Sequence, residues 1–227
     1  MPQIARQGGK VARVKNPDAP RIPGGLRAAE MPRDDFEDDA IVKGLLFDGE
    51  HLIGRDVEAL EVDGCAFENL RFTGTRLVRS QISDSRIVTC DFAEVSAQDV
   101  SFIRCTVTGS RMTGSSWKAG TFRDVTFENC TIAPAMFRNT KLYAVAFIDC
   151  RMSGADFQFA EMHNVRYVNC DLTGGQFGNV KMGTVRFENS TLLDVGGVSF
   201  FKGATVQGPG SMELALSLAR EVGINFE

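Results

Sequence analysis

Cysteine and histidine are the residues of this 227-residue chain whose side chains could bind a metal ion or perform redox chemistry. Cys130, Cys150 and Cys170 follow one another at intervals of twenty residues, and His163 lies between the last two. Zinc sites use cysteine or histidine pairs about two to five residues apart, and the sequence contains no such pair. We therefore expect no metal site and no cofactor, and the interval of twenty requires another explanation.

Catalytic constellations are also missing from the sequence. There are two histidines, His51 and His163, and no glycine-rich phosphate loop precedes a helical segment. Several aspartates recur at positions where a turn is expected, and aspartate is a common turn former: Asp84, Asp99, Asp124 and Asp149. The sequence therefore predicts a protein that is not an enzyme.

A large apolar residue recurs at every fifth position, a period that neither a helix nor a simple strand produces. From Phe67 to Leu192 only Ala97 is small. The series is Phe67, Phe72, Leu77, Ile82, Ile87, Phe92, Ala97, Phe102, Val107, Met112, Trp117, Phe122, Phe127, Ile132, Phe137, Leu142, Phe147, Met152, Phe157, Met162, Tyr167, Leu172, Phe177, Met182, Phe187 and Leu192. Such a sustained repeat predicts a solenoid.

Two further positions of the five-residue unit have their own character. The position two residues before the large one holds small or compact residues, and all six cysteines fall there: Cys65, Cys90, Cys105, Cys130, Cys150 and Cys170. The position two residues after the large one is rich in Gly and Asn, which tolerate the left-handed backbone of a sharp corner. The cysteines are therefore expected to be buried small apolar residues, with His163 on the outside.

This unit resembles that of the pentapeptide-repeat family, commonly written A-(D/N)-L-X-X. GADFQ at 154–158 and CDLTG at 170–174 are close matches, and the resemblance extends over about residues 45–206. It implies an all-β solenoid, a right-handed quadrilateral β-helix with four units per twenty-residue coil. About seven coils are then expected, and Phe127, Phe147 and Tyr167 should stack directly above one another.

The two ends of the chain differ from the repeat. Residues 1–40 contain no repeat, carry five prolines, and hold a net charge of +5 over residues 1–33, so we expect a mobile tail. The β-helix is expected over residues 41–207, followed by a capping and dimerisation helix with a short tail over 208–227. No run of eighteen apolar residues and no secretory signal is present, so the expectation is a cytoplasmic protein that does not span a membrane.

The C-terminal helix is expected over residues 212–222, where polar side chains share one narrow face and apolar ones cover the rest. An apolar surface that wide should cover the last coil and also meet a second copy of the chain. The alternative is a helix that only caps a monomer. The residues expected at this dimer interface are Leu214, Leu218, Val222, Ile224 and Phe226. Outward apolar or aromatic positions on the solenoid form a candidate partner surface: Tyr143, Ile148, Phe159, His163 and Val168.

The ending LSLAREVGINFE resembles that of the Qnr/MfpA-like branch of the family. That resemblance implies a dimer joined at C-terminal helices that protects or inhibits DNA gyrase or topoisomerase IV by imitating duplex DNA. However, residues 45–207 contain 19 acids and 16 bases, a net charge of only −3. The alternative is a generic protein-interaction rod with an unknown partner. Direct binding of nucleic acid is not expected.

Overall fold

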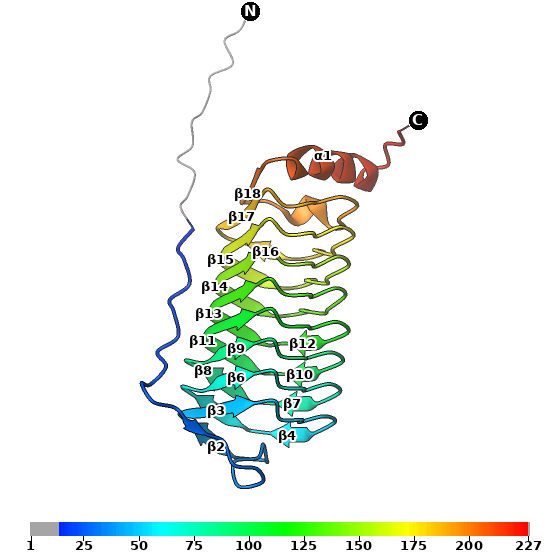
Figure 1. The fold of residues 1–227 in the computed structure, drawn as a ribbon. Helices are drawn as coiled ribbons and strands as arrows, with labels where there is room; N and C mark the ends of the chain where they lie inside the picture. Colours follow the sequence, from blue (N-terminus) through cyan, green and yellow to red (C-terminus); the bar gives the residue numbers. More distant parts are fainter. Residues whose placement is uncertain (1–13, 227) are drawn as a thin grey trace, which may run out of the picture.

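The computed structural model describes residues 14–226. It is a parallel β-solenoid of about nine turns that ends in a single C-terminal helix (Figure 1). The prediction of an all-β solenoid with a C-terminal helix is therefore confirmed. The count exceeds the expected seven coils, and strand β1 (Arg27–Ala28), which pairs with β3, already lies before the expected start at residue 41.

The strands are short because each side of a coil is one repeat unit long. The first nine are β1 (Arg27–Ala28), β2 (Ile41–Lys43), β3 (Leu45–Asp48), β4 (Asp56–Glu58), β5 (Glu61–Asp63), β6 (Ala66–Glu68), β7 (Arg76–Val78), β8 (Gln81–Ser83) and β9 (Arg86–Val88). The next nine are β10 (Ser96–Gln98), β11 (Ser101–Thr108), β12 (Ser116–Lys118), β13 (Thr121–Glu128), β14 (Lys141–Ile148), β15 (Glu161–Val168), β16 (Lys181–Met182), β17 (Val185–Glu188) and β18 (Ala204–Gln207). A 3-10 helix η1 (Val198–Phe200) and the helix α1 (Gly210–Glu221) follow the regular repeats.

The strands pair in parallel, and most partners are twenty residues apart, as Phe127 and Phe147 are. One sheet covers two adjacent sides of the solenoid. Side 1 carries β2, β5, β8 and the beginning of β11, and side 2 carries β3, β6, β9 and the end of β11. Side 3 consists of isolated bridges from His51 to Thr191, and side 4 carries β4, β7, β10 and β12.

The corners between sides lie at the position two residues after each large residue. Asn164 has φ 55° and Asn169 has φ 53°, and the same left-handed conformation recurs at this position along the solenoid. Asparagine and glycine adopt that conformation at low cost. The composition of the corner position was therefore a correct indicator of where each coil turns.

The large residues fill the interior as ladders of stacked rings. Phe127, Phe147, Tyr167 and Phe187 stack with centroids 4.9 to 5.0 Å apart and planes within 7° of parallel. A second ladder contains Phe137, Phe157 and Phe177, with centroids 5.1 and 5.4 Å apart. All the side chains of both ladders are fully buried, so burial and ring contacts together stabilise the interior.

A segment before the repeats runs along the outside of the solenoid. We call residues 14–26 the N-terminal strap, and Figure 1 shows it in blue descending along one side toward β3. The backbone N–H of Asp18 donates to Asp124 Oδ1 at 3.1 Å, and that of Arg21 donates to Asp84 Oδ1 at 3.0 Å. A Cβ on Gly64 would lie 2.9 Å from Pro23 Cδ, so the strap passes very close to this corner.

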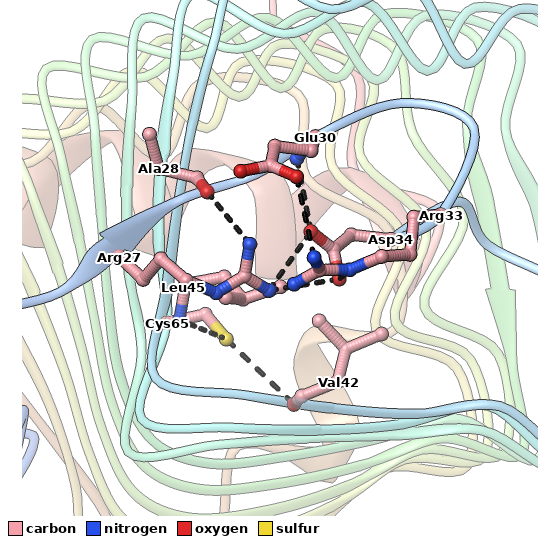
Figure 2. A network of polar contacts seen from close by, with 8 residues as sticks. All are labelled: Arg27, Ala28, Glu30, Arg33, Asp34, Val42, Leu45 and Cys65. Atoms are coloured by element: carbon pink, nitrogen blue, oxygen red, sulfur yellow. Dashed lines mark hydrogen bonds and ion pairs between the residues drawn. The ribbon is translucent and has the colours of Figure 1, made fainter.

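Residues 27–40 close the first end of the solenoid. Strand β1 pairs with β3, and Phe36 is 4% exposed with its ring 5.5 Å from that of Phe47. Figure 2 shows the polar contacts of the preceding turn, in which Asp34 accepts two hydrogen bonds of 2.9 Å from Arg27. That guanidinium and the backbone N–H of Glu30 lower the pKa of Asp34 to about 2.

The structure thus differs from the expected boundary at residue 41. Residues 1–13 of the expected tail lie outside the described residues, whereas residues 14–40 lie against the solenoid. This placement could not be predicted because the strap contributes mainly backbone N–H groups, which carry no sequence pattern. Among the described residues, no helix is long and apolar enough to cross a membrane.

Candidate protein-interaction surfaces

The cysteines that suggested chemistry lie inside the solenoid. All six are buried thiols, and the Cys170 thiol donates to the backbone carbonyl oxygens of Phe147 and Val168, with Sγ 3.4 Å from each. Burial raises the pKa of Cys90 to about 11 and that of Cys105 to about 12, so these two thiols stay protonated at neutral pH. Within residues 14–226, no cluster of three His, Cys, Asp or Glu side chains could hold a metal ion.

Charged side chains on the outside pair with the coil above or below. Arg76 lies 2.7 Å from Asp56, Arg111 lies 2.5 Å from Asp91, and Lys181 lies 2.7 Å from Glu161. Each partner is twenty residues away, and these ion pairs occupy sides 4, 3 and 1 respectively. At these points an acid is followed by a base on the next coil, and such ion pairs interrupt a stripe of negative charge.

The candidate partner surface begins with an aromatic column on side 1. The rings of Tyr143 and His163 are stacked, with centroids 5.5 Å apart and planes 6° from parallel. The guanidinium carbon of Arg123 lies 5.6 Å from the centroid of the Tyr143 ring, a cation–π geometry. Arg123, Tyr143 and His163 are register neighbours on β13, β14 and β15, so the sheet itself aligns them.

The other candidate residues lie elsewhere on the solenoid. Ile148 and Val168 are register neighbours on side 2, where both are half-buried. Phe159 occupies a corner next to side 4, where it is 51% exposed and lines a shallow cavity with Met136 and Arg138. The five residues singled out from the sequence therefore form three separate groups rather than one patch.

The C-terminal helix α1 contacts the last coil through its polar side. Glu213 accepts a hydrogen bond of 2.7 Å from the backbone N–H of Leu192, and the Ser217 hydroxyl donates to the Leu192 carbonyl at 3.3 Å. Glu221 accepts from the backbone N–H of Val198 at 2.7 Å. The backbone groups of Leu192 and Val198 lie on the exposed edge of the last coil, where a further coil would otherwise pair with them. The helix therefore covers the open end by hydrogen bonding as well as by packing.

The sides of α1 that do not contact the coil carry exposed apolar residues. Leu218 is 43% exposed and Val222 is 69% exposed, and in the tail beyond the helix Ile224 and Phe226 are 52% and 53% exposed. Leu214 lies on the inner side instead, where it packs against the core while half-buried. Met212, which is 69% exposed, was not among the expected interface residues but lies on this apolar side.

The narrow polar face of the helix could thus be predicted from the sequence. That this face contacts the solenoid could not. Amphipathic helices usually turn their apolar side to the protein. Here the unpaired backbone groups of the last coil favour the reverse orientation. The helix begins at Gly210 after Pro209, two residues before the start expected from the sequence.

Comparison with known proteins agrees with this architecture. Residues 120–196 match the family model described as "Pentapeptide repeat region". This part of the chain is a pentapeptide-repeat solenoid, and the resemblance drawn from the repeat unit is confirmed. No curated protein sequence matches the chain significantly.

Two solved structures illustrate the likeness. A trypsin-treated variant of QnrB1, a plasmid-mediated fluoroquinolone resistance protein, has 16% identity and a TM-score of 0.48, over 84% of this chain and 99% of that one. HetL, a pentapeptide repeat protein involved in heterocyst differentiation regulation from the cyanobacterium Nostoc sp. strain PCC 7120, has 12% identity and a TM-score of 0.38, over 70% and 74%.

Proposed function

We propose that this protein is a non-catalytic, protein-binding rod that forms a homodimer through the outer side of α1. The observation that carries the proposal is the orientation of the helix. Its polar residues are used against the solenoid, and its apolar residues face solvent. Large exposed apolar patches on soluble proteins often mark sites of protein association.

A second copy of the chain is the partner that best fits this surface. The helix is at one end of the rod (Figure 1), so a two-fold axis beside it would join two rods end to end without hindrance from the coils. Such an interface is self-complementary and closes on itself. Crosslinking tests it directly. Met212→Cys or Val222→Cys should allow two chains to be crosslinked at low micromolar concentration, whereas Ile53→Cys, at the other end of the rod, should not.

For the protein partner, the specific candidate is DNA gyrase or topoisomerase IV. It is supported by the proposed dimer helix and by the resemblance of LSLAREVGINFE to the ending of topoisomerase-protecting repeat proteins. Against it stands the charge pattern, because duplex DNA carries one negative charge per about 1.7 Å and here arginines interrupt the acids. Recognition of a topoisomerase would therefore depend on shape and on the exposed aromatic groups.

A gyrase supercoiling assay, with and without a fluoroquinolone, tests this candidate. Inhibition of supercoiling, or protection from the drug, at micromolar protein supports it, and both effects should weaken in Leu218→Glu if the dimer is the active form. No effect at that concentration rules it out. The general interaction rod then remains as the function, with a partner other than a type II topoisomerase.

A further inference from the structure

A polar cavity of about 620 Å³ lies between the N-terminal strap and side 2 of the solenoid. The strap forms one wall with Val14, Lys15 and Asn16, and the other wall consists of Arg166, Arg186 and Glu188. Arg166 on β15 and Arg186 on β17 are register neighbours, so their side chains emerge about 4.8 Å apart. The volume is within the range of small-ligand sites.

Arg166 is the unusual member of this cavity. Its Nε atom is buried and has no hydrogen-bond partner among residues 14–226. The structure records no ion pair for Arg166 within those residues, whereas the Nε of Arg186 donates to Glu188 at 3.1 Å. A buried, unpaired donor on a charged group costs free energy, and an anion in the cavity would remove that cost.

The donors and charges of the cavity indicate what that anion should be. Lys15, Arg166 and Arg186 contribute three positive charges to the lining, and Glu188 contributes one negative charge. Asp18 lies beside the lining and pairs with Lys15 at 3.2 Å, so the net charge around the cavity is +1. A phosphate monoester carries about −1.5 to −2 at neutral pH and three acceptor oxygens. Guanidinium forks bind such a group through paired hydrogen bonds. A carboxylate offers two acceptor oxygens rather than three, so it could satisfy fewer of these donors.

We propose that this cavity binds the phosphate group of a phosphate monoester, held by Arg166 and Arg186 from the solenoid and by Lys15 from the strap. Because one wall belongs to the strap, binding also fastens residues 14–16 to the side of the rod. The strap is otherwise attached nearby through the backbone N–H of Asp18 at Asp124. A ligand would therefore protect this segment from proteolysis.

Titration of the full-length protein followed by NMR of the arginine Nε–H groups tests the site. Glycerol phosphate should shift the Arg166 Nε–H signal saturably, and sodium acetate at equal ionic strength should not. Arg166→Gln and Arg186→Gln should each weaken binding at least about tenfold. Arg151→Gln is the matched control, because Arg151 lies on side 3 away from the cavity and has no ion pair among the described residues.

Trypsin gives a second readout of the same site. Glycerol phosphate should slow cleavage after Lys15 in the wild-type protein but not in Arg166→Gln. A short phosphoserine peptide is compared with glycerol phosphate to find the source of the phosphate. If the peptide binds about ten times more tightly, the natural ligand is a phosphorylated protein. If it binds equally or more weakly, the natural ligand is a small phosphorylated metabolite. Both rankings support the site.

Three results would overturn the proposal. The first is a shift at Arg166 no larger than at Arg151. The second is an equal response to acetate. The third is unchanged phosphate binding by Arg166→Gln and Arg186→Gln, provided that both variants retain the thermal unfolding of the wild-type protein.

Discussion

The Glu221 carboxylate accepts a hydrogen bond of 2.7 Å from the backbone N–H of Val198, which joins the end of α1 to the 3-10 helix of the last coil. The same carboxylate accepts from the Ser199 hydroxyl at 2.6 Å. With Glu213 at the other end of the helix, it fixes the polar side of α1 on the solenoid. The apolar side is then left exposed, so this contact underlies the proposed dimer interface.

Acidification should weaken this contact of Glu221. The Ser199 hydroxyl and the Val198 N–H lower the pKa of Glu221 below its usual range. A lowered folded-state pKa stabilises the protein above the unfolded pKa of about 4.3, and this contribution is lost as pH falls through the folded pKa. The Val198 amide proton should therefore titrate by NMR with a midpoint below about 4.3. This titration should be missing in Glu221→Gln, and a midpoint at or above the unfolded pKa would contradict the assignment.

Truncating Phe157 should severely destabilise the solenoid. Its ring is 0% exposed and stacks between those of Phe137 and Phe177, so Phe157→Ala should cost about 3 to 5 kcal/mol in the free energy of unfolding. Met136→Ala, on the outside of the neighbouring coil and 43% exposed, should change it by no more than about 0.5 kcal/mol. Urea unfolding measures both, and equal effects would argue against the inward assignment of Phe157.

Replacing Phe159 should instead stabilise the protein. Phe159 has φ 62° at a corner, a conformation that is costly for a bulky residue, and half of its side chain is exposed. Asparagine occupies the same position at other corners, so Phe159→Asn should raise the free energy of unfolding by about 1 kcal/mol. Thermal unfolding checks this. A loss of stability would mean that contacts of the ring with its neighbours outweigh the strain, and that Phe159 is retained for packing rather than for a partner.

The strap should loosen when Asp84 loses its charge. Asp84 accepts from the Arg21 N–H at 3.0 Å and from Arg104 Nε at 2.7 Å, and the Arg104 hydrogen bond lowers its pKa. Asp84→Asn should therefore speed trypsin cleavage after Arg21 several-fold. Asp99→Asn, at a corner that the described part of the strap does not contact through a hydrogen bond, should leave the rate unchanged. Equal rates in both variants would show that Asp84 does not hold the strap.

Sequence alone predicted those parts of the molecule in which each residue has an equivalent twenty positions away. The ladder of Phe147 and Tyr167 and the buried position of Cys150 follow from the period alone. The strap was not predictable in this way. Its hydrogen bonds join backbone N–H groups to carboxylates 63 and 106 residues away, and no repeat marks them.

The candidate surfaces show the same contrast. Leu218 and Val222 were predicted to be available for a partner and are exposed, whereas Leu214 is turned toward the core. The difference arises because the unpaired N–H of Leu192 attracts Glu213, which sets the rotation of the helix. The cavity at Arg166 was also missed, since it needs the strap as its second wall.

The central claim is tested most directly by the mass of the protein in solution, measured by size-exclusion chromatography with light scattering. Our account predicts twice the chain mass of 24.8 kDa for the wild-type protein at micromolar concentration. It predicts a monomer for Leu218→Glu and a dimer for Ile53→Glu, which places the same charge at an exposed apolar site far from α1. A wild-type protein that remains at 24.8 kDa, or a dimer that survives Leu218→Glu, would contradict it.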